Sequence, residues 1–135
     1  MKKIIELCFN VFDHEDSDLV VIEGSNNDIP FEIKRIFSVR SLTKTVRGKH
    51  AHKECTQVLT CPHGEIEVLC FDGKKEQAFK LDKPYKGLLI QPGIWAEQRY
   101  IKANSILTVI CDSFYDENEY IRDKEEFLKF KKLGV

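Results

Sequence analysis

The sequence has no long hydrophobic run and no excess of charge of one sign. Its apolar start, Ile4-Ile5, is interrupted by Glu6, which is too early for the apolar core of a signal peptide. No stretch approaches the roughly 20 apolar residues of a membrane span. The formal net charge is −1, with acids and bases interspersed, so no surface for nucleic acid or membrane is indicated. We therefore expect a cytoplasmic protein that has neither as a partner.

The cysteines do not form a pattern typical of a metal site or a disulfide framework. There are five, an odd number, and no two have the spacing of a zinc-ligand pair. Cys8, Cys61, Cys70 and Cys111 lie in apolar runs that resemble strands. These four are therefore expected to be reduced thiols in the core.

The dominant hydrophobic period is two, which is typical of strands. With 135 residues the chain is expected to form one domain, residues 1–135, with a single core. Short runs rich in β-branched or aromatic residues predict strands at Leu19–Glu23, Ile33–Val39, Gln57–Cys61, Glu65–Phe71, Gln77–Leu81, Gly87–Gln91 and Ile106–Cys111. Turn signals such as Asp72-Gly73 separate them. The pattern predicts a closed or sandwich-like all-β fold, a small β-barrel.

One helix is expected, at the C-terminus, from about Asp116 to Lys132. Asp116 suits the N-cap and Glu119 stands at the capping-box position. Lysines near the end, including Lys129 and Lys131, suit the negative end of the helix dipole. The sequence therefore predicts a β-barrel with a helical tail.

The most informative motif is Arg47-Gly48-Lys49-His50-Ala51-His52. Successive strand side chains alternate, so His50 and His52 are expected on one face. A lone strand histidine is usually structural, which is our interpretation of His14 and His63. A pair is different, because one neutral imidazole can accept a proton while another donates. We interpret His50 and His52 as a functional acid–base pair.

Metal binding is the competing interpretation of this pair. Metal-binding jelly rolls of the cupin type add a Glu five residues on and a third His on a later strand. Here these positions hold Gln57 and Ala96. A catalytic metal normally needs three protein ligands, and only two remain. We expect neither a metal nor a cofactor.

Two arginines are candidates for anion binding. Arg35 alternates with Ile33 and Phe37 on one face, where a cation is costly unless it meets an anion such as a phosphate. A pairing with an internal carboxylate, Glu97 or Asp112, is equally compatible with the sequence. Trp95 and Tyr100 can stack on a ligand or fill the core. Gln57 is expected to orient a histidine or a hydroxyl by hydrogen bonding.

Together these motifs resemble the sugar 3,4-ketoisomerases, small cupins of deoxyamino-sugar biosynthesis for surface polysaccharides and glycans. The resemblance runs over most of the chain. It is carried by residues 29–35, the run of residues 47–53, residues 57–59, Asp72-Gly73, residues 92–97, and the tail at 115–122 with its Tyr-Ile-Arg sequence. The relatives of this family include the deoxysugar 3,5-epimerases.

The resemblance implies a jelly-roll homodimer, often with an exchanged N-terminal strand, that acts on TDP-4-keto-6-deoxy-D-glucose without a metal. His50 and His52 match the histidine pair of the family, and Arg35 and Arg47 match its arginines. We therefore expect catalysis by the two histidines. The substrate-binding residues are expected to be Arg35, Arg47, Gln57, Trp95 and Glu97.

Three departures from the family pattern are visible. Family members often carry His at the position of Ala96 and an aromatic hydroxyl near Phe37-Ser38. They also have an Arg-Gly near the start that is not visible in residues 13–19. The difference at Ala96 affects a proton-handling contact, and the difference at Phe37-Ser38 affects an acid. The missing Arg-Gly affects an anion contact.

The reaction moves a proton from C3 to C4 of the sugar through an enediol. We hypothesise that His50 is the base and that His52 polarises an oxygen or relays the proton. Two alternatives stay open, a nucleotide-sugar 3,5-epimerase and a non-catalytic cupin that binds a nucleotide-sugar.

Overall fold

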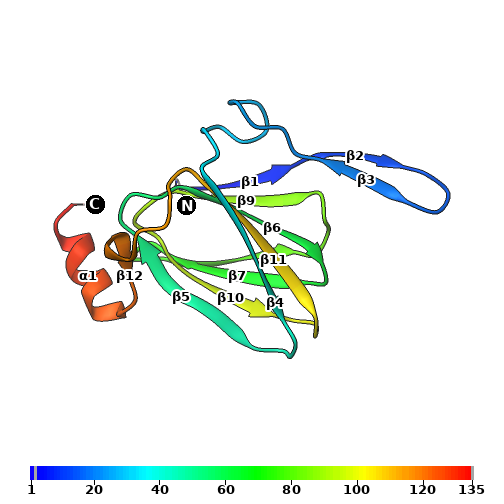
Figure 1. The fold of residues 1–135 in the computed structure, drawn as a ribbon. Helices are drawn as coiled ribbons and strands as arrows, with labels where there is room; N and C mark the ends of the chain where they lie inside the picture. Colours follow the sequence, from blue (N-terminus) through cyan, green and yellow to red (C-terminus); the bar gives the residue numbers. More distant parts are fainter. Residues whose placement is uncertain (2, 135) are drawn as a thin grey trace.

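The computed structural model describes residue 1 and residues 3–134, and they form a sandwich of two antiparallel sheets (Figure 1). One sheet has the order β1-β9-β6-β11-β4 and the other has the order β12-β5-β10-β7-β8. The elements are β1 (Ile4–Cys8), β2 (Asn10–Asp13), β3 (Asp18–Val21), β4 (Arg35–Ser41), β5 (Val46–His52), β6 (Gln57–His63), β7 (Ile66–Phe71), β8 (Glu76–Leu81), β9 (Lys86–Ile90), β10 (Trp95–Tyr100), β11 (Ser105–Cys111), η1 (Glu117–Glu119), β12 (Tyr120–Ile121) and α1 (Lys124–Lys132).

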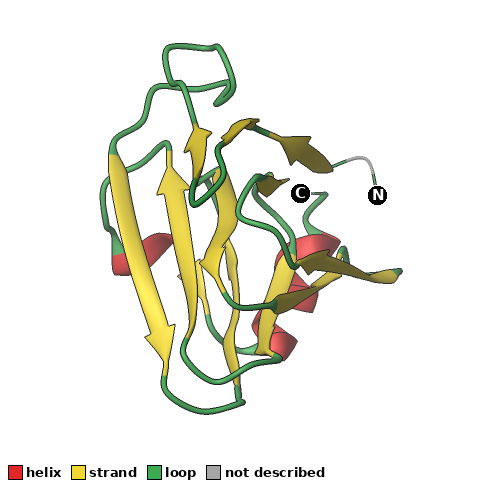
Figure 2. Cartoon of the chain, turned by 90° about the vertical axis from the view of Figure 1, so that its right-hand side faces the viewer, coloured by secondary structure: helices red, strands yellow, loops and turns green. Residues whose placement is uncertain are grey.

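The jelly-roll expectation is confirmed, with one refinement. Seven predicted strands are present within two residues of their expected bounds, as β3, β4, β6, β7, β8, β9 and β11. The two large sheets remain separate in their hydrogen bonding, so the body is a sandwich rather than a closed barrel. Seen from the side, strands make up most of the body (Figure 2).

The core lies between the two sheets and follows from the alternation of strand side chains. In β7 every second residue is buried, beginning with Ile66, and Val68 and Cys70 follow on the same face. These residues belong to the main apolar cluster, which also takes Leu59 of β6 and Leu88 of β9. The side chains that face this interior nearer its open end form the candidate site.

A separate hairpin projects from the sandwich. Strands β2 and β3 pair only with each other, and Phe12 stands opposite Leu19 (Figure 1). Both side chains are more than half exposed, at 53% and 56%. The hairpin therefore presents apolar surface that this chain alone does not cover.

The C-terminal helix begins later than expected. Asp116 caps the short η1 turn by accepting from the backbone N–H of Asn118, and the chain then extends through β12. The helix α1 begins after Asp123, whose carboxylate accepts from the backbone N–H of Glu125. The single-helix interpretation of residues 116–132 was wrong because Tyr120-Ile121 pairs with β5, and this pairing outweighs the local helix signal.

One cysteine was also placed wrongly. Cys8 is exposed at the end of edge strand β1, whereas Cys61, Cys70 and Cys111 are buried as expected. All five cysteines are unpaired. None of the helices in the described part of the chain has the length and apolar character of a membrane span.

Candidate active site

A β-bulge in β5 sets the direction of the motif side chains. Ala96 of β10 stands opposite His50, and the next residue, Glu97, stands opposite Gly48, so Lys49 is an extra residue. Gly48 has φ +86°, and a Cβ there would lie 2.1 Å from Oε1 of Gln98. Only glycine fits this position without strain.

The interior between the sheets contains a cavity of about 230 Å³. Three of the expected site residues line it together: Arg47, His50 and Gln57. The remaining lining residues are Phe37, Val39, Gly48, Leu59, Gln98, Tyr100, Leu107, Val109 and Arg122. An imidazole, two amides and two guanidinium groups thus share one apolar chamber, which is typical of a small-molecule site.

His50 is a neutral base with a free nitrogen. Its Nδ1 lies 2.9 Å from the carbonyl oxygen of Gly48, which can only accept, so Nδ1 carries the hydrogen. Burial lowers the pKa of His50 from 6.5 to about 4, and this outweighs the opposing effect of the hydrogen bond to Gly48. Near neutral pH the ring is therefore uncharged, and Nε2 holds a lone pair that can take a proton.

His52 lies beside His50 on the same face, as predicted. The two ring centroids are 4.9 Å apart and the rings meet nearly edge to face. Nδ1 of His52 hydrogen-bonds Oε1 of Glu119, and both side chains are buried. Burial lowers the pKa of His52, with Glu119 acting in the opposite direction. Its Nε2 is buried and has no hydrogen-bond partner among the residues that the structure describes.

Arg35 lies beyond the histidines, beside Tyr120. One guanidinium nitrogen, Nη2, donates to the Tyr120 hydroxyl at 3.2 Å and contacts Sγ of Cys111 at 3.6 Å. Burial is the largest single influence and acts to lower the pKa of Arg35, but hydrogen bonding to Tyr120 and contact with Cys111 together raise it. The carboxylates considered as partners, Glu97 and Asp112, form no ion pair with it among the described residues.

Tyr120 brings this arginine to the histidine pair. Its ring centroid lies 4.4 Å from that of His52 and 5.2 Å from that of His50. Arg122 covers the same tyrosine ring at 4.6 Å and pairs with the carboxylate of Glu117 through two nitrogens, at 2.7 and 3.0 Å. Residues 117–122 therefore close one side of the site.

Gln57 meets Cys111 rather than a histidine. Its Nε2 lies 3.6 Å from Sγ of Cys111, the same sulfur that Arg35 contacts. The neighbouring Cys55 thiol is the largest influence and lowers the pKa of Cys111, with smaller contributions from Arg35 and Gln57. The Cys111 sulfur thus contacts two polar side chains of the site, Arg35 and Gln57.

Trp95 and Glu97 do not line the cavity. Trp95 is buried on the outer face of its sheet, where its ring centroid lies 5.9 Å from that of Phe127 in α1. Glu97 precedes Gln98, whose side chain faces the cavity, so alternation directs Glu97 away from it. Tyr100 does line the cavity, and burial raises its pKa to about 12.

Glu119, Tyr120 and Arg122 were missed as site residues. Their segment was interpreted as helix, and the sequence signal that was present, the Tyr-Ile-Arg tail, entered only through the family resemblance. In the structure the pairing of β12 with β5 places Tyr120 directly opposite His52.

Two other features compete as sites. A larger cavity of about 370 Å³ lies along β1, β8 and β9, but no histidine is among its lining residues. His52, Cys55 and Glu119 offer ligand atoms within 4.8 Å of one another. However, the His52 and Glu119 atoms already hydrogen-bond each other, and Oε2 of Glu119 accepts from two backbone N–H groups.

Comparisons with known proteins agree on one family. The family described as "FdtA: WxcM-like, C-terminal" matches residues 2–132. The TDP-4-oxo-6-deoxy-alpha-D-glucose-3,4-oxoisomerase of Aneurinibacillus thermoaerophilus is 38% identical over 113 residues, which are 83% of this chain and 81% of that protein.

Two solved structures are similar over nearly the whole chain. A 3,4-ketoisomerase from Helicobacter canadensis has 37% identity and a TM-score of 0.90, covering 96% of this chain and 97% of that one. A histidine-to-asparagine variant of the 3,4-ketoisomerase QdtA from Thermoanaerobacterium thermosaccharolyticum, in complex with TDP-4-keto-6-deoxyglucose, has 30% identity and a TM-score of 0.93, covering 98% and 96%.

Proposed function

The chain belongs to the FdtA (WxcM-like, C-terminal) family of sugar 3,4-ketoisomerases, and from this we propose that it isomerises TDP-4-keto-6-deoxy-D-glucose to the TDP-3-keto-6-deoxyhexose. The observation that carries the proposal is that His50 lines the cavity as a neutral imidazole. Its Nδ1 carries the hydrogen, and its Nε2 is unprotonated. A neutral base that lines a cavity is what proton removal beside a ketone requires.

The reaction consists of two proton transfers, one from carbon C3 to carbon C4 and one from the C3 oxygen to the C4 oxygen. His50 takes the C3 proton, which the neighbouring C4 carbonyl makes acidic, and the electron pair forms a C3–C4 double bond. The carbonyl electrons move to the C4 oxygen, where charge grows. After a proton passes from the C3 oxygen to the C4 oxygen, His50 returns its proton to C4 and the C3 carbonyl forms. Atoms and charge balance without a co-reactant.

The substrate contacts that we propose are those of the cavity. Arg47 and Arg122 supply positive charge for the anionic nucleotide-sugar, and the Gln57 amide faces the sugar. Arg35 acts through the Tyr120 hydroxyl that it holds. The proposed contacts no longer include Trp95 and Glu97, which lie outside the cavity.

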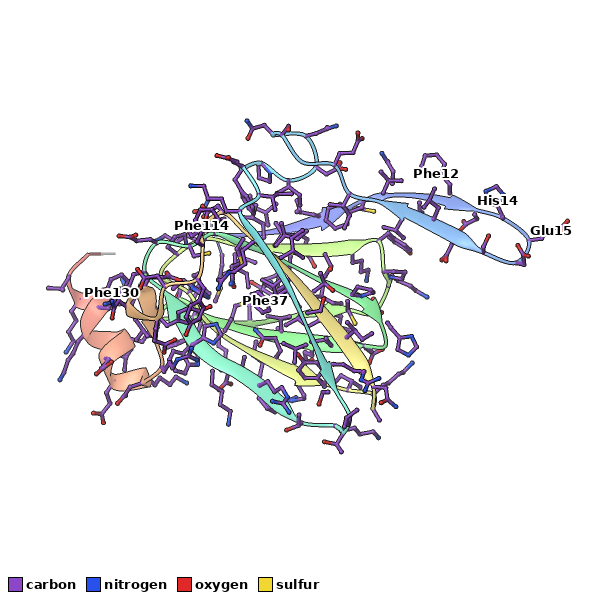
Figure 3. The ribbon with its side chains drawn as sticks, in the orientation of Figure 1. Phe12, His14, Glu15, Phe37, Phe114 and Phe130 are labelled. Atoms are coloured by element: carbon purple, nitrogen blue, oxygen red, sulfur yellow. The ribbon has the colours of Figure 1, made fainter. Side chains whose placement is uncertain are left out.

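We also propose a homodimer formed through the β2–β3 hairpin. Phe12, His14 and Glu15 project away from the sandwich (Figure 3), and Phe12 and Leu19 form an exposed apolar cross-strand pair. Replacing both Phe12 and Leu19 with Ser is expected to give a monomer in light scattering. Five unpaired cysteines agree with a cytoplasmic enzyme.

One experiment separates this function from its alternatives. The protein is incubated with TDP-4-keto-6-deoxyglucose in D₂O, and the sugar protons are followed by NMR. A 3-keto sugar is expected, with deuterium at C4 because the proton that His50 holds exchanges with solvent before it is delivered. Exchange at C3 and C5 without carbonyl migration would instead identify a 3,5-epimerase, and binding without exchange would identify a non-catalytic binding protein.

A further inference from the structure

We infer that Cys111 is a buried thiolate, the counter-ion of Arg35, and that it positions the side chains of Arg35 and Gln57 at the candidate active site. This role rests on the proposed function, because both side chains are assigned there to the same isomerisation. Cys111 is not among the residues that line the cavity, so it holds other groups rather than contacting the substrate.

The sheet places Cys111 directly between these two side chains. Cys111 ends β11, and its Cα partners are Arg35, the first residue of β4, and Gln57, the first residue of β6. Residues that stand opposite each other in adjacent antiparallel strands have their side chains on the same face. Cys111 is 0% exposed, so its sulfur meets the neighbouring side chains rather than water.

The sulfur accepts from a donor on each side. Nη2 of Arg35 lies 3.6 Å from Sγ of Cys111, and Nε2 of Gln57 lies at the same distance. Neither nitrogen can accept a hydrogen bond in return. A sulfur that faces a guanidinium and an amide nitrogen is better served by lone pairs than by a hydrogen, which is typical of a thiolate beside an arginine.

Arg35 needs a negative charge that no carboxylate supplies. It takes part in none of the ion pairs of the described residues, and Nη2 otherwise donates to the Tyr120 hydroxyl. Its Cζ lies 5.3 Å from the ring centroid of Phe37 and 5.5 Å from that of Tyr115. Tyrosine hydroxyls ionise only near pH 10, so the group in contact that can carry the charge at lower pH is Cys111.

The surroundings of the sulfur favour its ionised form. The neighbouring Cys55 thiol lowers the pKa of Cys111 most, burial opposes it, and Arg35 and Gln57 lower the pKa further. Contact with Cys111 and burial raise the pKa of Cys55. The two thiols therefore share a single negative charge, and it resides on Cys111.

Two carboxylates lie near the two cysteines, and both are already occupied. Asp112 follows Cys111, and its Oδ1 accepts from a backbone N–H and from a serine hydroxyl. Glu119 accepts from a histidine and from two backbone N–H groups, one of them that of Cys55. Neither forms an ion pair with Arg35 in the described part of the chain, so the sulfur has no competitor for the guanidinium.

The thiolate fixes the direction of both donors. Nη2 of Arg35 has two hydrogens, and one points to the sulfur while the other points to the Tyr120 hydroxyl. The ion pair thus holds the arginine that holds the tyrosine ring against the histidines. Because the Gln57 nitrogen faces the sulfur, the amide oxygen remains as an acceptor for a sugar hydroxyl in the cavity that Gln57 lines.

Ultraviolet absorbance of the ligand-free protein tests the charge, because a thiolate absorbs where a thiol does not. The difference between wild type and Cys111→Ser should contain a thiolate band at about pH 8, below the ordinary cysteine pKa of about 8.5. Arg35→Met should lose the same band. Cys61→Ser is the matched control, because burial raises the pKa of this other buried thiol to about 11 and its removal should leave the band unchanged.

A double-mutant cycle tests the positioning role. Cys111→Ser and Arg35→Met should each lower kcat/KM about 10- to 100-fold, the range that corresponds to a hydrogen bond to a charged group. In the Arg35→Met background, Cys111→Ser should change kcat/KM less than about threefold, because without the arginine the sulfur is already uncharged. Cys61→Ser should leave the wild-type rate unchanged.

Other outcomes overturn the inference. Identical spectra of wild type and Cys111→Ser would show that Cys111 is a thiol, and a band that survives in Arg35→Met would exclude the arginine as its counter-ion. Losses that multiply in the double variant would show that the two residues act independently.

Variants that do not fold leave the test in place. If Arg35→Met is lost, Cys111→Ser decides alone, since a wild-type kcat/KM would exclude the positioning role. Cys111→Ala replaces a serine variant that does not fold. The spectrum needs no substrate, so wild type that shows the band but does not isomerise TDP-4-keto-6-deoxyglucose overturns the proposed function, and the positioning role with it, separately from the charge.

Discussion

Arg35 donates a hydrogen bond to the hydroxyl of Tyr120 across 85 positions of sequence, at 3.2 Å. The contact ties β4, at the edge of one sheet, to the short β12 at the edge of the other. It also holds the tyrosine ring against both histidines. The site is thus assembled across the open end of the sandwich rather than on one strand.

Replacing Tyr120 with Phe should lower the free energy of unfolding by about 1.5–3 kcal/mol, the usual contribution of a hydrogen bond to a charged group. The ring is kept, and only the acceptor for Arg35 is lost. Urea unfolding measures the change. Tyr115→Phe is the matched control, since its hydroxyl meets only the exposed Glu117 and its loss should cost less than about 0.5 kcal/mol. Equal effects would contradict the assigned contact.

Replacing His50 with Asn should lower kcat about 10²- to 10⁴-fold, because the neutral base at the cavity is removed. TDP binding, measured by calorimetry, should change little, since the proposed nucleotide contacts are arginines. His63→Asn is the control, because that side chain is exposed at the end of β6. A variant of His50 that isomerises at the wild-type rate would exclude it as the base.

The pH dependence of stability follows from the lowered pKa of His50. The folded value, about 4, lies below the ordinary imidazole value of 6.5. Between these pH values the unfolded chain binds more protons, so the free energy of unfolding rises with pH. The contribution is fully present above pH 6.5, is lost as pH falls toward 4, and amounts to about 3 kcal/mol at one pKa unit per 1.36 kcal/mol.

Urea unfolding of wild type and His50→Asn at a series of pH values checks this prediction. The wild type should lose stability more steeply than the variant on acidification, because Asn does not titrate. The lowered pKa of His52 contributes in the same direction in both proteins. Identical slopes would show that His50 titrates normally in the folded chain.

Replacing Gly48 with Ala should destabilise the chain by about 2–3 kcal/mol, through backbone strain at positive φ and through overlap with Gln98. Isomerisation should also fall, because the bulge that aims His50 is disturbed. A second change, Gln98→Ala, should recover part of the stability by opening space. Gly134→Ala shares the φ of +86°, but apart from its chain neighbours no described residue lies within 4 Å of the added Cβ, so it separates strain from overlap. No recovery in the double variant would contradict the steric account.

The sequence predicted the jelly roll and the shared face of His50 and His52 because both depend on a period of two. Strand alternation alone does not predict that Arg47 lines the cavity with His50, since residues three apart in a regular strand point to opposite faces, and Arg47 was expected at the site only from the family resemblance. The extra residue Lys49 restores them to one side. Gly48 was visible in the sequence, but the one-residue offset in β5 depends on how this strand pairs with β10.

The contribution of the C-terminal tail to the site was harder to predict from local sequence patterns. Residues 116–132 carry caps and charges typical of one helix, and two helical segments do form there. The extended stretch between them exists because β5 offers a free edge to Tyr120 and Ile121. Glu119 looked like a capping residue and instead binds His52, a partner 67 positions away. A pattern in a short stretch of sequence does not identify partners that lie so far apart in the chain.

The docking of β12 on β5 gives the enzyme an order of assembly. Residues 1–111 contain every strand of the two large sheets except β12, and they are translated before the tail. At that stage His52 has no carboxylate behind it and Arg35 has no tyrosine to hold. The tail therefore supplies the partners of both His52 and Arg35, and a chain that stops at residue 111 lacks both of them.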